Sequence, residues 1–336
     1  MKKSVLSACC CLLLGSGIQA QQLFRFTQYR AYTQIINPAA FDAQYLLLGD
    51  EWSIGLSHRR QWVNLPEGAP THYLLSAHVL SRPRANQRLR YSMGGQAFQS
   101  ETGPIRQSGI RWNGALRLKL GESLAAGGLS IGCNAGVNHT SIQFRQIRAF
   151  HAADPTLFVD QPQWANFDFD VGVFFHRQID NFRLLGARQG EDDGDVFYLG
   201  VSIPQVIENV TEFRQEEGGF TMERVPHLYF QAAYLARIND FSFLEFASWF
   251  RYVNGAPLSQ DFNLRYNYSW SDQRLALWLR TGIKTSSPRT FYYETGIRFF
   301  VAENTINLGW GGEFHSSDLR KEGGTFELNL SISGNR

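Results

Sequence analysis

Polar and apolar residues alternate without a break in Phe262-Asn263-Leu264-Arg265-Tyr266-Asn267-Tyr268-Ser269-Trp270. Every even position of this run holds an apolar or aromatic residue, and every odd position holds a polar one. Because successive side chains of a β-strand point to opposite faces of its sheet, a period of two predicts a strand. One face of that strand is apolar and the other is polar, so the two faces must meet different surroundings.

The same alternation recurs from about residue 50 to the C-terminus, in segments of roughly ten residues separated by turns. The fifth segment is long and rich in glycine, which predicts a bend or bulge near Gly132 to Gly136. The pattern predicts fourteen strands, at approximately 50–59, 71–80, 89–101, 108–120, 123–144, 166–177, 195–204, 225–238, 241–252, 259–270, 273–284, 290–301, 304–314 and 325–333.

Charged residues of these strands fall on the face opposite the apolar set. An Arg or Lys on the lipid-facing side of a membrane barrel costs about 2–4 kcal/mol near the bilayer midplane. One-sided charges therefore predict an antiparallel transmembrane β-barrel with a polar lumen. The candidate lumen charges are Arg111, Arg117, Lys119, Asp168, Asp170, Glu245, Arg251, Arg265, Arg280, Glu294, Arg298 and Glu327. A soluble β-sandwich or propeller also has alternating strands, but few need 26 Phe, 13 Tyr and 8 Trp.

The lengths of the connections support the barrel independently. Tight turns follow even-numbered strands, whereas longer loops mostly follow odd-numbered ones, as membrane barrels arrange their periplasmic turns and external loops. The tight turns are Gly121-Glu122, Asn239-Asp240, Ser271-Asp272 and Ala302-Glu303, and the long loops are 60–70, 145–165, 205–224 and 315–324. One connection, 178–194, breaks the rule as a long acidic turn that contains Glu191-Asp192-Asp193. Four aromatic residues are candidates for the interfacial girdles: Tyr252, Trp270, Tyr292 and Trp310.

The N-terminus has the features of an export signal. Lys2 and Lys3 precede an apolar run, Val5 to Gly17, that is too short to span a bilayer as a helix. We predict Sec-type export with cleavage after Ala20. Leu6-Ser7-Ala8-Cys9 resembles a lipoprotein box, so lipoprotein processing is the alternative.

Three segments follow from this division of the chain. We expect a signal peptide at 1–20, an N-terminal periplasmic or lumenal segment at 21–49 and a β-barrel at 50–336. Cleavage after residue 20 leaves Cys133 as the one cysteine, which excludes an intramolecular disulfide. Asn37-Pro38 in the second segment is interpreted as a turn rather than a binding site.

Several motifs occur in an order that is itself informative. Phe26-Thr27-Gln28-Tyr29 and Ile36-Asn37-Pro38-Ala39 come first. The most specific group runs from His58-Arg59-Arg60-Gln61-Trp62 through Glu67-Gly68-Ala69-Pro70 to Leu75-Ser76-Ala77-His78. The later ones are Gly103-Pro104, Asn166-Phe167-Asp168, 197–204, 226–229 and 255–259. This ordered set resembles the PorP/SprF family of the type IX secretion system. The C-terminal strand departs from common barrels by ending without an aromatic residue.

The resemblance implies a non-enzymatic outer-membrane component of the type IX secretion and gliding machinery of Bacteroidota. Its implied partners are outer-membrane lipids, other type IX secretion components, a secreted adhesin held at the cell surface and a peptidoglycan-binding periplasmic protein. No nucleic-acid partner is indicated, because 32 basic residues balance 30 acidic ones. The alternative function is a diffusion porin or small-solute channel, which would conduct ions.

A search for catalytic and binding motifs leaves one candidate site. The eight His are scattered without metal-ligand spacing, and no nucleophile elbow, phosphate loop or EF-hand pattern occurs, so neither an enzyme nor a cofactor is predicted. The first external loop is the candidate partner-interaction site, through Arg59, Gln61, Trp62, Glu67, Gly68, Ala69 and Pro70. The alternative is an Ω-loop folded over the barrel mouth with Trp62 buried.

Overall fold

The computed structural model describes residues 33–40, 49–65, 68–82, 87–121, 124, 126–143, 163–179, 184–185, 194–207, 209–215, 218–239, 241–270, 274–285, 289–316 and 323–335. The predicted signal peptide and the acidic run Glu191-Asp192-Asp193 lie outside these residues. Within them, no helix is long and apolar enough to cross a membrane.

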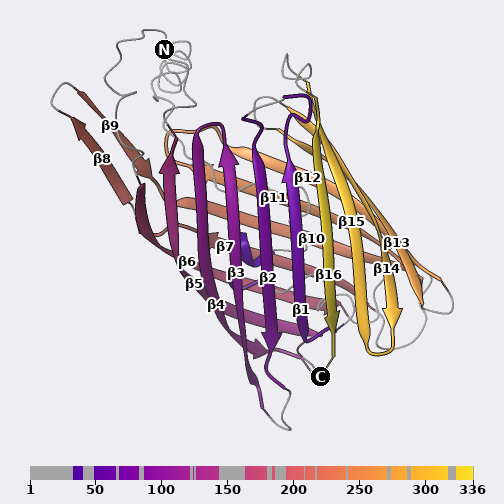
Figure 1. Cartoon of the computed structure of the whole chain (residues 1–336). Coiled ribbons are helices and arrows are strands. Elements are labelled where there is room, and N and C mark those ends of the chain that lie inside the picture. The colour runs from indigo at the N-terminus through magenta and orange to yellow at the C-terminus, as the bar shows by residue number, and fades with distance from the viewer. Residues whose placement is uncertain are drawn as a thin grey trace, which may run out of the picture.

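Fourteen antiparallel strands of the described chain close into one barrel, as the sequence pattern predicts (Figure 1). They are β1 (Trp52–Arg60), β2 (Thr71–Leu80), β3 (Leu89–Thr102), β4 (Ile105–Lys119), β5 (Gly127–Ile142), β6 (Gln163–Ile179), β7 (Asp195–Ile203), β10 (His227–Asn239), β11 (Ser242–Val253), β12 (Ser259–Ser269), β13 (Leu275–Lys284), β14 (Thr290–Val301), β15 (Asn304–His315) and β16 (Thr325–Gly334). The closing pair is β1 with β16, in a continuous register from Trp52 opposite Gly334 to Arg60 opposite Phe326. Closure pairs the edge amides, which could not remain unpaired in hydrocarbon.

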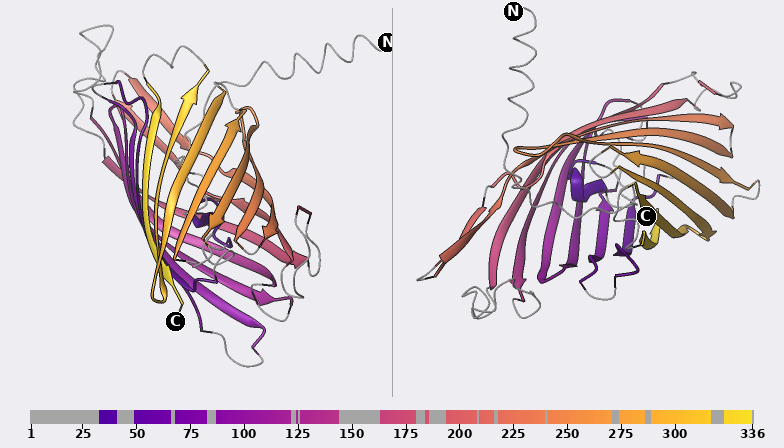
Figure 2. Two further views of the ribbon diagram at one scale, coloured as in Figure 1. Left: turned by 90° about the vertical axis from the view of Figure 1, so that its right-hand side faces the viewer. Right: turned by 90° about the horizontal axis from the view of Figure 1, so that it is seen from above.

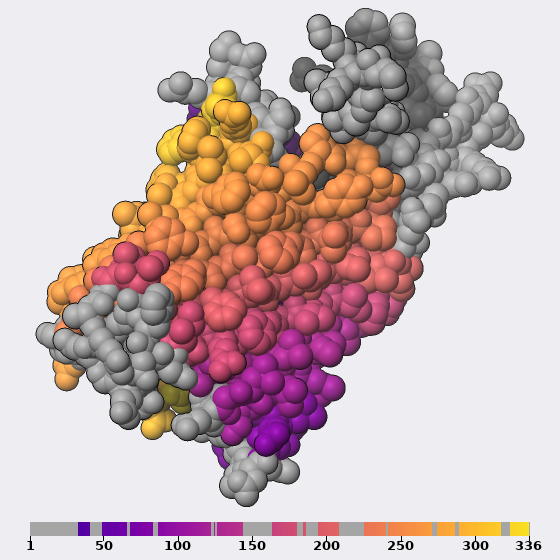
Figure 3. All heavy atoms as spheres, turned by 180° about the vertical axis from the view of Figure 1, so that it is seen from behind, coloured from indigo at the N-terminus to yellow at the C-terminus, as the bar shows by residue number. Residues whose placement is uncertain are grey.

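The two faces of each strand differ as their alternation requires. On β1, Ile54 and Leu56 are 51% and 52% exposed, whereas Ser57 and Arg59, which follow on the opposite face, are buried. The same division runs around the barrel, so the apolar set faces outward and the polar set faces the lumen. Figure 3 shows the outer wall from behind, where side chains coloured from purple to orange cover the strands as one surface.

Turn lengths separate the two ends of the barrel. The connections after β10 and β14 occupy only 240–241 and 302–303, at the end where β16 finishes. Most connections after odd-numbered strands are longer, which identifies that end as external by the usual rule for membrane barrels. The largest departures from this division are two: Gly103-Pro104 joins β3 to β4 tightly, and 180–194 joins β6 to β7 over a long stretch. The connections 81–88 and 120–126, at the same end as 180–194, are also longer than a tight turn.

Three expectations were wrong. The stretch 205–224, expected to be a loop, contains a hairpin of β8 (Asn209–Gln215) and β9 (Gly218–Arg224), which projects from the barrel (Figure 1). β5 has no bulge near Gly132, because its register with β4 and β6 is unbroken there. Tyr292 is not a girdle residue, since it is buried in the lumen, where its hydroxyl donates to Asp261.

Candidate functional site

A segment of the N-terminal region occupies the lumen. It consists of the one-turn helix α2 (Thr33–Ile36) and the turn that follows it, and its eight residues, 33–40, are all buried. Seen from above, the short indigo helix lies inside the ring of strands (Figure 2). We call residues 33–40 the plug. Asn37-Pro38 lies in its turn, and the Asn37 side chain accepts a hydrogen bond from the Ala39 amide at 3.0 Å.

Lumen-facing side chains satisfy the backbone carbonyls of the plug. Arg117 donates to the Ala39 oxygen at 3.0 Å and to the Ala40 oxygen at 3.1 Å. Asn113 donates to the Pro38 oxygen at 2.9 Å, and further donors are Asn134 to Gln34 and Ser202 to Ile36. A one-turn helix cannot pair its own last carbonyls, so these donors replace the water that the lumen excludes.

Three glycines on adjacent strands allow the plug to approach the barrel wall. Gly132, Gly172 and Gly200 lie on β5, β6 and β7. The inward direction is filled by Asn37 or its neighbours at the first two, and by Gln231 together with Asn37 at Gly200. A Cβ at Gly132 would lie 2.6 Å from the Pro38 oxygen, closer than real Cβ atoms come. We call these three residues the glycine cradle. Glycine in β5 therefore serves a close backbone contact rather than a bulge.

All twelve predicted lumen charges lie on the inward face of their strands, opposite the exposed apolar set. Ten are buried, and Lys119 and Arg251 are partly exposed. Burial of a charge is costly unless a partner compensates it, so the pairing of these groups decides whether the lumen is stable.

Opposite charges meet between strands, from β4 to β6 past β5 and from β13 to its neighbour β14. Arg111 lies 2.7 Å from Asp168 and 3.5 Å from Asp170, and Arg280 lies 2.9 Å from Glu294. Contacts with neutral and aromatic groups add to the network: the Arg265 guanidinium stands 4.6 Å from the Trp278 ring centroid, Glu245 accepts from Tyr198, and Arg298 donates to Asn307. Among the described residues, no three His, Cys, Asp or Glu side chains are grouped to hold a metal ion.

Arg59, predicted to belong to the external loop, lies elsewhere. It is the penultimate residue of β1, has no solvent exposure and faces the lumen. Its guanidinium binds both carboxylate oxygens of Glu313, at 3.0 and 2.9 Å, and reaches Glu327 at 3.3 Å. Lys284 contacts the same Glu313 carboxylate. The interaction assignment of Arg59 is therefore wrong, because period two on β1 places it on the face of Ser57.

The remaining loop residues fold against two neighbouring connections. The Gln61 backbone amide closes the loop by donating to the Pro70 oxygen at 2.8 Å, and the Gly103 backbone amide donates to the Gly68 oxygen at 3.2 Å. The Val63 amide donates to Gly324, which precedes β16, at 3.2 Å. We call this grouping of 61–65, 68–70, 103–104 and 323–324 the outer loop cluster. Glu67 lies outside the described residues, and Gly68 and Ala69 are exposed and half-buried.

Trp62 is the strained residue of the outer loop cluster. Its φ of +51° lies in the left-handed region, which costs a bulky side chain about 1–3 kcal/mol. Its indole Nε1–H is buried, and no described residue accepts it. Its side chain is partly exposed rather than fully buried. Strain and an unmatched donor at one partly exposed position mark Trp62 as a residue that ordinary loop packing does not account for.

Sequence reasoning missed the seat of the plug and part of the lumen network. Asn113 and Asn134 occupy inward positions of strands that were identified correctly, but neither carries a charge to attract notice. The glycine cradle becomes visible only once the register of β5, β6 and β7 is known. Glu313 and Lys284 lie inside the predicted strands 304–314 and 273–284, but the contact of Glu313 with both Arg59 and Lys284 becomes visible only once β1 is known to close the barrel against β16.

Comparison with known proteins extends the geometry. Two solved structures cover 96% of the chain: a FadL homologue from Pseudomonas aeruginosa and the toluene transporter TodX from Pseudomonas putida. Their TM-scores are 0.53 and 0.51, their identities 10% and 7%, and 97% and 96% of their own lengths are covered. These similarities show an outer-membrane barrel fold and nothing finer. No curated protein matches the sequence.

The sequence comparison is more specific. Residues 18–332 match the family model described as Type IX secretion system membrane protein PorP/SprF. The match spans the plug, the outer loop cluster and the barrel strands up to two residues before the end of β16. The match therefore includes both the lumen and the loop end as the structure describes them. This chain belongs to the PorP/SprF family of type IX secretion system membrane proteins.

Proposed function

We propose that this family member is a non-enzymatic, non-conducting barrel that supports secretion or surface retention of a partner protein through its outer loop cluster. The observation that carries the proposal is the packed lumen. Arg59, Arg117 and Glu327 have no solvent exposure although they face inward. Charges that line a diffusion pore are in contact with its water, and these charges contact protein groups instead.

The porin alternative is weakened by the same contacts. The plug fills one side of the lumen, held by Arg117 and the glycine cradle. The opposite wall is crossed by the ion pairs of Arg59 with Glu313 and Glu327. These pairs hold the charged side chains of that wall in place, because removing one partner of such a pair costs about 3–5 kcal/mol.

The outer loop cluster supplies the external surface for a partner. Its hydrogen bonds join the connections after β1, β3 and β15, so the loop is held by the barrel rather than by itself. Trp62 brings a large aromatic side chain, a strained backbone and a buried donor to this position. Interface residues that dominate binding energy are enriched in Trp.

The test is Trp62→Ala in cells that secrete the partner. We expect normal barrel assembly and reduced retention or secretion of the partner, because the aromatic anchor is lost while Gly68 and Pro70 still shape the loop. Cell-surface and supernatant fractions would be compared by quantitative mass spectrometry.

Tyr252→Ala is the matched control, since Tyr252 is an exposed aromatic of β11 outside the cluster. Heat-modifiable migration at wild-type abundance must hold for both variants. Full cargo display by a folded Trp62→Ala variant would assign Trp62 to loop structure and remove it from the site.

A further inference from the structure

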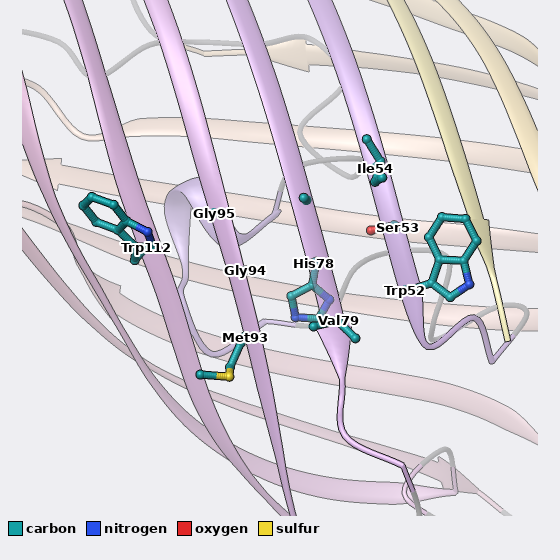
Figure 4. Close-up of a pocket in the computed structure, with 10 residues that line it drawn as sticks. Trp52, Ser53, Ile54, His78, Val79, Met93, Gly94, Gly95 and Trp112 are labelled. Carbon is teal, nitrogen blue, oxygen red and sulfur yellow. The ribbon is translucent and has the colours of Figure 1, made fainter. Parts of the chain in front are cut away.

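A groove crosses the outward face of β1 to β4. It has a volume of about 620 Å³, within the range of ligand-binding pockets, and is lined by Trp52, Ser53, Ile54, Ala77, His78, Val79, Met93, Gly94, Gly95 and Trp112. Figure 4 shows these residues on neighbouring strands, with Trp52 and Trp112 at opposite ends of the row. The groove exists because Ala77 and Gly95 are small where their neighbours are large.

The groove belongs to the hydrocarbon-facing surface. Ile54, Met93 and Trp112 point outward in the same register as the exposed apolar band and are 51%, 60% and 62% exposed. The groove starts at Trp52, which pairs with Gly334 and with Val79 at the short-turn end, and continues to mid-strand on β4. Its occupant must therefore be an apolar chain that enters from the periplasmic side.

A basic turn stands at the lower end of the groove. Val79 lines the groove and Leu80 ends β2, after which the chain continues to Arg82 and returns through Arg88 to β3. Both arginines are exposed, and the Lys119 amide donates to the Arg88 oxygen at 2.8 Å, which brings the end of β4 beside this turn. The Glu51 carboxylate beside Trp52 is already balanced by Arg90 at 2.7 Å.

We infer that the groove binds one phospholipid of the periplasmic leaflet, with an acyl chain along the groove and the phosphate at Arg82 and Arg88. Both halves of that molecule are matched: the groove is apolar and the turn beside its entrance is cationic. Arg and Lys form strong charge-assisted hydrogen bonds with phosphate oxygens, and basic groups at the membrane surface attract anionic lipids. A second copy of this chain could cover the apolar groove with its own apolar surface. It would offer no anion to the arginines, and through the same face it would place its own basic turn against them.

Native mass spectrometry of the full chain in detergent provides the test, with palmitoyl-oleoyl phosphatidylglycerol as the probe. The wild-type protein should retain one lipid, and Ala77→Phe should lose it, because the phenyl ring fills the groove. Gly95→Leu should also lose it, and a Cβ there meets only the Arg111 backbone oxygen at 3.6 Å, so the barrel accommodates the change. Ala232→Phe is the matched control, since Ala232 faces outward on β10, outside the groove.

The head-group contact is tested separately. The double variant Arg82→Gln, Arg88→Gln should bind phosphatidylglycerol no better than palmitoyl-oleoyl glycerol, which has the acyl chains without the phosphate, whereas the wild type should prefer the phosphatidylglycerol. Equal lipid retention by Ala77→Phe and Ala232→Phe, both folded, would overturn the site. A wild-type dimer that Ala77→Phe dissociates, without bound lipid, would assign the groove to a second copy instead.

Discussion

The charge balance of one lumen wall depends on a single residue of β1. Arg59 contacts Glu313 and Glu327, which come from β15 and β16, and so connects three strands on either side of the barrel closure. Because all three side chains are buried, water cannot take the place of the guanidinium beside the two carboxylates. The main energetic consequence of this pairing is therefore that any substitution that leaves one of the buried charges without its partner destabilises the barrel.

Arg59→Ala should lower the free energy of unfolding by about 3–5 kcal/mol, because it leaves two buried carboxylates without their shared cation. Urea-induced unfolding of the barrel in phospholipid vesicles, followed by heat-modifiable migration, measures the change. The neighbouring Arg60 is exposed on the same strand, so Arg60→Ala should have an effect within about 1 kcal/mol. Similar losses in both variants would mean that the pairing does not stabilise the barrel.

The outward positions are governed by hydrocarbon instead. Leu264 faces outward near the middle of β12, and Leu264→Arg should destabilise the barrel by about 2–4 kcal/mol in the same vesicle assay. Leu264→Phe is the control at that position, since it changes size without adding charge. Asn263 on the inward face is unsuitable, because it accepts a hydrogen bond from Arg280 at 3.0 Å and a new Arg there would repel that cation. An unchanged free energy of unfolding in the Leu264→Arg variant would mean that this position does not face the hydrocarbon.

At the scale of elements, a simple period accounts for the strands. Alternation places β12 and β16 within a residue or two of their predicted bounds, since in a barrel each side chain faces either lipid or lumen. The two-residue period gives no information about segments that do not separate lipid from lumen. The β8–β9 hairpin projects beyond the barrel, and the plug lies inside it, so neither forms part of the wall between lipid and lumen.

The glycine cradle could not be predicted for a related reason. Glycine within a strand suggests a bulge, a bend or a close backbone approach, and only the neighbouring strands distinguish these cases. Gly132 lies directly opposite Gly172, while Gly200 lies opposite Phe174, two residues further along β6. The close approach of residues 37–39 to this patch selects the third case, and that contact joins residues about a hundred or more positions apart.

Gly132→Val should displace the plug, because its Cβ would lie 2.6 and 2.7 Å from the Pro38 oxygen and the Ala39 amide nitrogen. The readout is maleimide labelling of Ala40→Cys in a Cys133→Ser background, since Ala40 has no solvent exposure while the plug is seated. We expect slow labelling that becomes fast in the Gly132→Val variant. Gly114→Val is the control, because a Cβ at Gly114 meets nothing within 4 Å. Unchanged labelling in a folded Gly132→Val barrel would contradict the cradle.

At the scale of the whole molecule, the polar residues form the interior and the apolar residues form the surface. The outward Leu, Ile and aromatic side chains are stable in hydrocarbon, whereas exposing them to water would be unfavourable. The closed hydrogen-bonded wall leaves no strand edge unpaired. The interior must then be either filled with water or internally paired. Buried ion pairs and the plug pair large parts of it internally, and the proposal of a non-conducting barrel rests on this pairing.

Purified wild-type protein that fractionates with the outer membrane and migrates heat-modifiably should therefore produce no stable conductance steps in planar bilayers. The Gly132→Val variant sharpens the test, because it displaces the plug from β5, β6 and β7 while the Arg59 ion pairs remain on β1, β15 and β16 across the barrel. If the packed charges close the lumen by themselves, that variant should also be silent. Steps that appear only in Gly132→Val would make the plug the sole barrier, whereas steps in the wild type would restore the porin alternative and remove the basis of the proposed function.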